Sequence, residues 1–403
     1  MANTNTVLIP KVLHRGLMAL RERVIMPRLV NSDFSNEAVK KCTQIVIPLP
    51  VAVADQEVAP SNVLVAPTDV TPTSATLSLD QWRHSLPIGL TNKEKTEIDA
   101  SEDFLPMQMS EAIKGLANTL NQYIWGKYTT DRTGVYGFIS NPSAGAASAI
   151  LDPFGTGTTD TSGVSAATNA KKVLNAQLCP RQDRRGVLNF NAEAAMLDLG
   201  AISDAEKIGS SDVKISGEVG CKFGIDWFAD DHVPTHTVGT CFAASPADVT
   251  CREAEAAGVT AISILDAGAG TLVAGDIFTI AGDTQTYVVT GSNAPYTLHA
   301  SNDTQVSIAP ALQVAVSGSE VITVKNSHTV NMVFHRDAFG FAMRVLELDT
   351  EGRQVMTMTD PISGITLRLM VTPQHYQTTW SFDILYGAEL VRPELAMRVA
   401  GAI

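Results

Sequence analysis

The chain has 403 residues, of which 45% are hydrophobic and 18% charged, so the composition is compatible with a sizeable core. Its net charge of −13 argues against a dedicated nucleic-acid binder, because binding to phosphate needs a basic face. No apolar run approaches the roughly 20 residues of a membrane span, and charged residues interrupt any signal-like segment at the N-terminus. Five scattered cysteines without CxxC spacing indicate free thiols in a reducing cytoplasm.

Residues 1–45 form the basic region of the chain, with seven Lys or Arg residues. Apolar residues recur there at helical spacing: Leu13, Leu17, Leu20 and Val24. The pattern predicts an amphipathic helix. Two interpretations stay open: an ordinary surface helix, which the composition favours, and an arm laid across a neighbouring subunit.

Residues 46–92 change character, because prolines punctuate short β-type runs such as NVLVAP and SATLSL. The second run alternates small polar and apolar residues with a period of two. This predicts a long irregular hairpin that has little means of burying itself. Such a segment is typical of a flexible loop or of an element that binds a partner.

Residues 101–128 carry the strongest helical pattern of the chain. Ser101 is a plausible N-cap, followed by two acidic residues at the positive end of the helix dipole. One face is apolar: Met109, Ile113, Leu116, Leu120, Ile124 and Tyr128. We expect a packing helix, which Gly115 and Ala117 would let another element approach closely.

The middle of the chain alternates loops, helices and strands. The Gly-, Ala- and Ser-rich residues 140–165 predict a loop, and helices are predicted at 166–178 and 191–199. Residues 253–324 contain no Lys or Arg against seven acidic residues, and short alternating runs there are separated by turn residues: DIFTI, TYVVT, QVSIA, QVAVS and EVITV. This block predicts a small antiparallel barrel or sandwich inserted into a larger domain.

The C-terminal part alternates apolar and polar residues over two long stretches. Leu367, Leu369 and Val371 alternate with Arg368 and Met370. The same period of two follows in a second run: Trp380, Phe382 and Ile384 against Ser381 and Asp383. Two long strands of a sheet with one buried face are predicted.

No catalytic motif stands out: the chain has neither a P-loop nor a nucleophile elbow, and its Gly-rich segments lack the dinucleotide fingerprint. The best metal-like cluster is Asp230, Asp231, His232 and His236. Pro234 makes a helix with both histidines on one face improbable, so a polar turn is the favoured interpretation. We therefore predict no enzyme activity, no cofactor, no catalytic residue and no metal ligand.

The run NMVFHRDAFGFAMRVL and the later run TTWSFDILYGAELVRPELAMRVAG resemble tailed-bacteriophage coat proteins of the Hong Kong 97-like (HK-97-like) fold. The likeness is to the branch of the Salmonella short-tailed phage coat, in which an aspartate precedes Tyr-Gly and then Arg-Pro-Glu. The matching residues are Asp383, Tyr386, Gly387, Arg392, Pro393 and Glu394. Three further stretches fall in the family's order: GLANTLNQYIW, CPRQDRRGVLNF and VAGDIFTIAG.

The resemblance implies an α+β chain with the HK-97-like phage capsid fold and an inserted small antiparallel β-barrel. Residues 1–45 would be an N-terminal arm and 46–92 the extended hairpin (E-loop). Residues 93–140 and 361–403 would form the peripheral domain, with its spine helix at about 101–128. Residues 141–252 and 326–360 would form the axial domain, and 253–325 the inserted barrel.

The function that this resemblance implies is a major capsid protein, assembling as hexamers and pentamers into the icosahedral head of a tailed phage. The alternative is another virion structural protein, such as a tail or adhesion module. The implied partners are copies of the chain itself, a separate scaffolding protein, a portal, packaged DNA through weak non-specific proximity, and a decoration protein. No membrane is implied, and the particle would assemble in the cytoplasm of a bacterial host.

Two departures from the family sharpen these expectations. Residues 51–92 contain no Lys, so we expect a shell without covalent cross-links through the hairpin. The chain also begins almost directly with the arm, which favours a separate scaffolding protein. The candidate subunit-contact residues are all arginines: Arg15, Arg21, Arg23, Arg28, Arg83 and Arg392.

Overall fold

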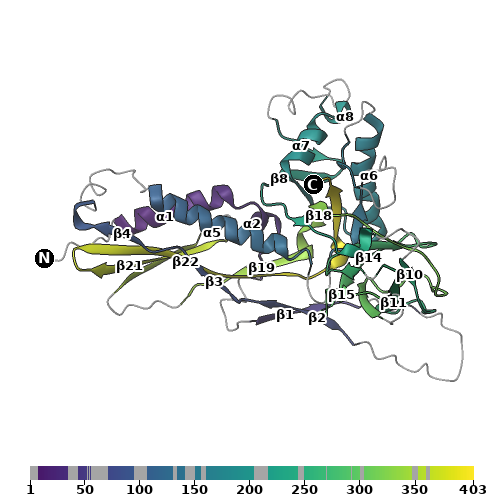
Figure 1. The fold of residues 1–403 in the computed structure, drawn as a ribbon. Coiled ribbons are helices and arrows are strands. Elements are labelled where there is room, and N and C mark those ends of the chain that lie inside the picture. The colour runs from purple at the N-terminus through teal and green to yellow at the C-terminus, as the bar shows by residue number, and fades with distance from the viewer. Residues whose placement is uncertain are drawn as a thin grey trace, which may run out of the picture.

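The computed structural model of the chain contains two large β-sheets, a six-stranded barrel and a separate hairpin (Figure 1). It describes residues 8–34, 44–51, 53, 55, 71–94, 107–129, 134–140, 150–155, 160–203, 217–243, 249–268, 270–291, 293–299, 304–346, 353–359 and 364–403. No helix in this described part is both long and apolar enough to cross a membrane.

The first sheet, called the long sheet here, is organised around strand β22, Gln377–Leu390. Four antiparallel strands pair with the two edges of β22: β21 (Thr366–Gln374) and β4 (Ile88–Thr91) with its first part, and β3 (Gln81–His84) and β19 (Phe339–Met343) farther along. Strand β20 (Gln354–Thr359) continues the sheet beyond β21. The hairpin of β21 and β22 confirms the two long strands predicted from the alternating pattern.

Helices α1 (Leu8–Arg23), α2 (Met26–Leu29) and α5 (Met107–Gly126) lie over one face of the long sheet (Figure 1). Side chains of the two long helices are buried against it: Val12, Leu13, Leu17, Leu20, Met109, Ile113, Leu116, Leu120 and Ile124. The predicted apolar face of residues 101–128 is therefore the packing face of α5. The first six residues of the predicted helix, 101–106, lie outside the described part.

The N-terminal helix α1 packs on α5 and on strands β20 and β21 of its own chain, and both interpretations of residues 1–45 stay open. A Cβ added at Gly16 would meet Ile113 Cδ1 at 2.6 Å, so this glycine lets α1 approach α5 closely. Gly115, which we expected to allow close approach, has no atom within 4 Å of an added Cβ. That expectation is corrected, because Gly115 lies on the exposed side of α5.

The predicted hairpin has a paired base formed by β1 (Gln44–Leu49) and β2 (Thr73–Ser78). Their antiparallel register runs from Gln44 opposite Ser78 to Leu49 opposite Thr73. The pairing ends at Ser78, whereas the prediction extended the hairpin to residue 92. Strands β3 and β4 instead join the long sheet, because β22 offers them a backbone edge. The predicted run NVLVAP lies outside the described residues.

The second sheet, called the central sheet here, mixes parallel and antiparallel pairs. Its strands are β5 (Gly137–Ile139), β23 (Ala396–Gly401), β18 (His328–His335), β6 (Arg184–Leu188), β8 (Ile225–Ala229), β7 (Gly220–Lys222) and β9 (Thr235–His236). Three helices accompany it: α6 (Asp160–Ala176), α7 (Phe190–Leu197) and α8 (Gly200–Ser203). Helix α6 starts earlier than predicted from 166, because Ala166, Ala167 and Ala170 give it a buried face that outweighs its Gly- and Thr-rich start.

The two sheets are joined by two neighbouring chain crossings. Strand β18 continues through the short helix η2 (Arg336–Ala338) into β19, and β22 continues through η3 (Pro393–Leu395) into β23. The backbone N–H groups of Val391 and Arg392 both donate to the carbonyl of Ala338, at 2.9 and 3.1 Å. Each of the two sheets contains strands that precede the barrel in the sequence and strands that follow it.

The barrel follows the strand order β10 (Val249–Cys251), β11 (Ala261–Asp266), β16 (Thr304–Ala309), β14 (Thr286–Thr290), β13 (Ile277–Ile280) and β17 (Ile322–Val324). Thr250 bridges Val321, and the N–H of Cys251 donates to the carbonyl of Glu320 at 2.9 Å, which closes the ring. A small ribbon of β12 (Thr271–Leu272) and β15 (Tyr296–Thr297) and the turn η1 (Thr240–Ala243) adjoin it.

Four of the five runs named from the sequence are barrel strands, and the inserted barrel is thereby confirmed. The fifth, QVAVS, contributes a single bridge between Val316 and Glu255. The barrel has a hydrophobic cluster separate from that of the two sheets. The domain boundaries drawn from the sequence remain predictions.

Candidate subunit-contact surfaces

The metal-like cluster of the sequence is a fastening point for the long helix. Asp230 is buried after β8, where its Oδ2 accepts hydrogen bonds from Asn121 Nδ2 at 2.7 Å and Trp125 Nε1 at 2.8 Å. Its Oδ1 accepts from the N–H of His232 at 3.0 Å. The carboxylate thus ties α5 to the central sheet.

The four residues of that cluster do not converge. Asp230, Asp231 and His232 come within 4.8 Å of one another, but His236 belongs to a different group, where its Nε2 donates to Asp276 at 2.8 Å. Both oxygens of Asp230 accept hydrogen bonds from the protein, and the interpretation of this stretch as a polar turn stays a prediction.

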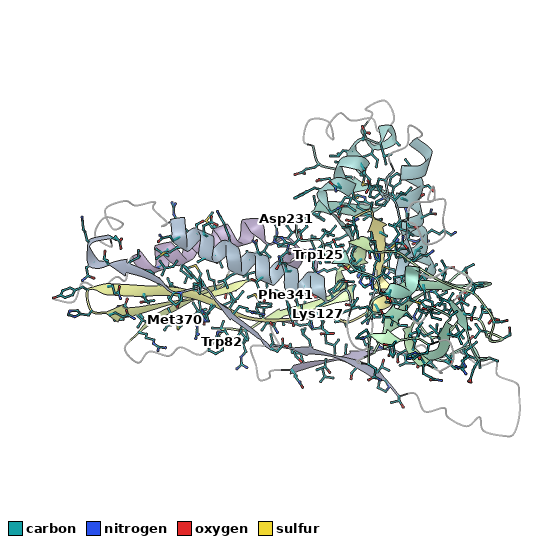
Figure 2. All side chains as sticks on the ribbon, viewed as in Figure 1. Trp82, Trp125, Lys127, Asp231, Phe341 and Met370 are labelled. Atoms are coloured by element: carbon teal, nitrogen blue, oxygen red, sulfur yellow. The ribbon has the colours of Figure 1, made fainter. Side chains whose placement is uncertain are left out.

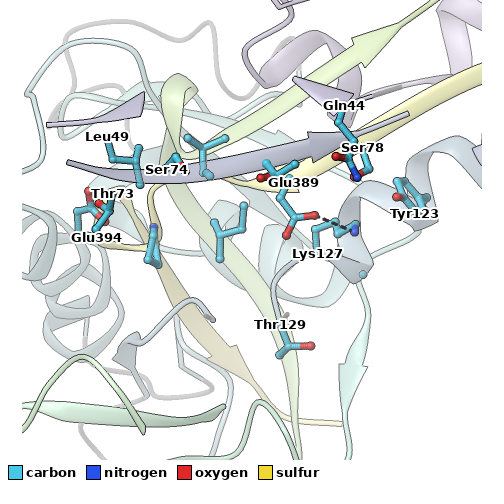
Figure 3. Close-up of a pocket in the computed structure, with 16 residues that line it drawn as sticks. Gln44, Leu49, Thr73, Ser74, Ser78, Tyr123, Lys127, Thr129, Glu389 and Glu394 are labelled. Atoms are coloured by element: carbon cyan, nitrogen blue, oxygen red, sulfur yellow. Dashed lines mark hydrogen bonds and ion pairs between the residues drawn. The ribbon is translucent and has the colours of Figure 1, made fainter. Parts of the chain in front are cut away.

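A groove of about 1080 Å³ lies at the base of the hairpin. Strands β1 and β2 form one wall, and the end of α5 and the end of β22 form the other (Figure 3). On this second wall, Lys127 Nζ pairs with Glu389 Oε2 at 3.0 Å and lies 5.0 Å from the ring centroid of Tyr123. Burial raises the pKa of Tyr123, and its hydroxyl donates to Asp80. The groove is therefore polar at its rim and braced by contacts within the chain.

Gly387 sets the distance between the hairpin and the long sheet. A Cβ at this position would lie 2.0 Å from the carbonyl oxygen of Ser78, which is far inside van der Waals contact. Behind this contact a small apolar cluster seats the hairpin: Ile45, Leu77, Leu79 and Ala342. Glycine at position 387 is thus required for the backbone of β2 to pass this close to β22.

Asp383 is the polar centre beneath the hairpin. It is buried, and it receives Arg368 from the neighbouring strand through a forked pair whose Nε–Oδ1 distance is 2.8 Å. Trp82 Nε1 donates to the other oxygen at 3.1 Å. A buried, bidentate pair of this kind is costly to break, because removing one partner strands a charge.

The other residues that carry the family resemblance also have structural roles. Tyr386 is fully buried with its ring 5.3 Å from that of Tyr123, and burial raises its pKa to about 12. Arg392, Pro393 and Glu394 form the start of η3, where the chain turns from the long sheet into the central sheet. These positions therefore shape the joint between the sheets.

Large apolar side chains are exposed on the hairpin, on the side of the long sheet away from the helices, and in the loop between β3 and β4. Trp82 is 62% exposed, Val46 is 62% exposed and Leu86 is 82% exposed. Figure 2 shows Trp82 on the side of the sheet away from α1 and α5. A second groove, of about 670 Å³, runs between residues 83–89 and the exposed side of α5 around Ala112 and Gly115. These side chains were not among the predicted contact residues. The sequence did predict that the segment 46–92 has little means of burying itself, which agrees with their exposure.

The six predicted contact arginines do not gather in one place. Arg15 is exposed on α1 and Arg28 at the end of α2, while Arg83 is exposed on β3. Arg392 is half-buried at the start of η3. The side chains of Arg21 and Arg23 lie outside the described part of the structure. A contact role for these residues stays a prediction.

Comparison with known proteins reveals a likeness of fold. No protein-family model matches the chain, and no curated protein matches it. A solved chain from Mycobacterium phage Che8 superposes with a TM-score of 0.50 at 10% identity, covering 94% of this chain and 91% of that one. The capsid of the cyanophage P-SCSP1u gives a TM-score of 0.49 at 13% identity, covering 94% and 88%.

The first of these likenesses extends over nearly the whole of both chains. It shows that the chain has the HK-97-like fold of tailed-phage capsid proteins, including the mixed α+β architecture expected from the sequence. The narrower likeness to the Salmonella phage branch stays a prediction.

Proposed function

We propose that the chain is a major capsid protein, which assembles with copies of itself as hexamers and pentamers into the icosahedral head of a tailed phage. The head encloses double-stranded DNA, and the role of the chain is structural rather than enzymatic. The capsid fold supports this proposal, together with one feature of the surface: a hairpin that leaves large apolar side chains exposed. In this proposal the arm, hairpin, peripheral, axial and barrel parts follow the boundaries given by the sequence.

The exposed apolar residues are the observation that carries the proposal. Leu86 and Val46 lie on segments that the chain itself does not cover, and Trp82 exposes its ring while its Nε1 is fixed by Asp383. Burying one such side chain contributes roughly 1.5–3 kcal/mol. A neighbouring copy that covers these side chains is therefore bound more tightly. At Trp82 the ring is already held in place by its hydrogen bond to Asp383.

Charge supports the same arrangement. Exposed arginines on α1, α2 and β3 face solvent in a chain with a net charge of −13. Arg15, Arg28, Arg83 and the other predicted arginines then pair with acidic surface of adjacent copies, which makes assembly sensitive to salt. The acidic balance also keeps contacts with packaged DNA weak and non-specific.

The partners that follow are a separate scaffolding protein, a portal and a decoration protein, with assembly in the bacterial cytoplasm and the virion as the final location. The shell is held by non-covalent contacts. The alternative of a tail or adhesion module gains no specific support from the described residues, since the fold is that of capsid proteins.

Negative-stain microscopy tests the proposal on the chain expressed alone and with a candidate scaffolding protein. We expect closed shells, or spirals and tubes that become uniform shells when scaffold is present. A matched pair of variants sharpens the result: Leu86→Asp should block shells, whereas His299→Gln, an exposed change on the barrel, should not. A monodisperse monomer or dimer under every condition would overturn the proposal.

A further inference from the structure

The barrel meets the central sheet through a small junction of mixed character. On the apolar side, Ile277 and Val288 of the barrel pack against Phe138 and Ala400 of the central sheet. Beside this cluster lies a buried polar group, which is called the junction cluster here and consists of Tyr128, His236, Asp276, His328 and Arg398.

Arg398 of β23 supplies the positive charge of the junction cluster. Its side chain is fully buried, and its Nη1 donates to the carbonyl of Gly275 in the barrel at 2.8 Å. The guanidinium lies 4.8 Å from the ring centroid of Tyr128. Burial lowers its pKa to about 10, so the group stays charged at neutral pH.

Asp276 of the barrel supplies the balancing negative charge. Its carboxylate accepts from His236 Nε2 at 2.8 Å and from the N–H groups of Gly239 and Val273 at 3.2 and 2.7 Å. Since Nε2 of His236 donates, its Nδ1 can accept from the Tyr128 hydroxyl at 3.1 Å. The imidazole of His236 thus bridges Asp276 of the barrel and Tyr128 after α5.

His328 adds a second imidazole to the same buried space. Its ring centroid lies 5.4 Å from that of His236. Burial first, and then the charges of Arg398 and His236, lower its pKa to about 3. The charged and titratable groups around these imidazoles come from every element at the junction: Tyr128 after α5, Asp276 before β13, and Arg398 on β23.

This arrangement has one carboxylate, Asp276, for the guanidinium of Arg398. A proton on His328 adds a further cation to the site of Arg398, and Asp276 is the one carboxylate among the described residues that contacts the cluster. Like charges in a buried site repel strongly, so the cost falls on the contact between barrel and sheet.

We propose that the junction cluster is an acid-sensitive latch, in which protonation of His328 releases the barrel from the central sheet while the barrel itself stays folded. The barrel can move as a body because its hydrophobic cluster is separate from that of the sheets. The latch goes beyond the proposed capsid role and does not depend on it, because it operates within one chain.

Hydrogen exchange on the full, unassembled chain tests the latch near pH 7.5 and near pH 5, with rates corrected for intrinsic pH dependence. We expect the amide of Gly239, which donates to Asp276 from outside the barrel, to exchange about ten-fold faster at the lower pH. Amides of Val273 and β16, inside the barrel, should keep their protection. Equal loss in β16, or no change at Gly239, would overturn the proposal.

Variants identify the protons involved. His328→Gln should abolish the acid response, because this position can then gain no charge, and a response that persists would sink the latch. The variant leaves the Asp276 contacts intact. If it does not fold, His328→Asn, which cannot take up a proton either, serves in its place. His299→Gln, on the exposed barrel surface, is the matched control and should respond like the unaltered chain.

Discussion

The barrel and the long sheet differ in how far their side chains find partners within the chain. Inside the barrel, acidic residues hold the chain's own loops: Asp266 accepts from the N–H groups of Gly268 and Gly270, and Glu320 accepts from those of Ser317, Gly318 and Ser319. Among the large apolar residues described there, Val314 alone is exposed. The long sheet with its hairpin instead exposes Val46, Trp82, Leu86 and Tyr376.

The difference teaches how to interpret the charge of the barrel. A block without Lys or Arg suggests an acidic surface, yet several of its carboxylates serve as acceptors for backbone groups that turns leave without partners. The barrel is self-sufficient, whereas the long sheet and hairpin have apolar surface to share. We therefore expect self-association to concentrate on the long sheet.

The largest expected effect is on the long sheet, at the buried pair of Arg368 and Asp383. Arg368→Met leaves Asp383 charged and unpaired, which should lower the free energy of unfolding by about 3–5 kcal/mol. Tryptophan fluorescence during urea unfolding measures this, because all four tryptophans lie outside the barrel block.

The control for that variant removes both charges. Arg368→Met combined with Asp383→Leu should recover most of the loss, since replacing a buried pair by apolar groups is often neutral. If the double variant is as unstable as the single one, packing rather than charge explains Arg368, and the long sheet resembles the barrel more than we argue.

The next effect concerns the seat of the hairpin. Gly387→Ala should cost about 1–3 kcal/mol, because its Cβ collides with the Ser78 carbonyl and β2 must shift. Gly115→Ala is the matched control: nothing lies within 4 Å, so helix propensity should add up to about 1 kcal/mol. Unfolding midpoints decide, and similar values for both variants would contradict the close crossing of β2 over β22.

Within the barrel, Asp266→Asn tests the role of the carboxylates. Asparagine offers one acceptor oxygen where the carboxylate offers two, so the barrel should lose about 1–3 kcal/mol. Hydrogen exchange in β11 and β16 should report the loss, while tryptophan fluorescence should not change. A fluorescence change of equal size would show that the barrel does not behave as a separate unit.

The smallest effect on stability is expected at the exposed apolar positions. Val46→Thr and Leu86→Ser should change the free energy of unfolding by less than about 0.5 kcal/mol, since neither side chain is buried within the chain. Shell yield, followed by light scattering and microscopy, should nevertheless fall. Normal yield for both variants would move the subunit contact to another surface.

Local patterns predicted much of this structure. The period of two at Leu367–Val371 and the apolar face of α5 needed no distant partner to be recognised. Strand β11 was missed, because most of its residues are buried and its alternation is weak. The start of α6 was missed for another reason: its Gly- and Thr-rich composition predicts a loop, whereas tertiary packing makes it helical.

The contacts at the hairpin base could not be predicted, because they join distant parts of the chain. The close approach of Ser78 explains why position 387 is a glycine. The hydrogen bonds from Arg368 and Trp82 explain why position 383 is an aspartate. The resemblance marked Asp383 and Gly387 without a physical reason for either. The reason lies in a strand register that no single segment specifies.

The two crossings at η2 and η3 have a consequence for synthesis on the ribosome. Strand β23 follows every other described strand in the chain, yet it lies inside the central sheet, between β5 and β18. The barrel, made earlier, can close while translation continues, but the central sheet stays open until β23 emerges. An interrupted chain would carry a folded barrel on an unfinished body, so a cell's proteases would remove it before it could spoil a growing shell.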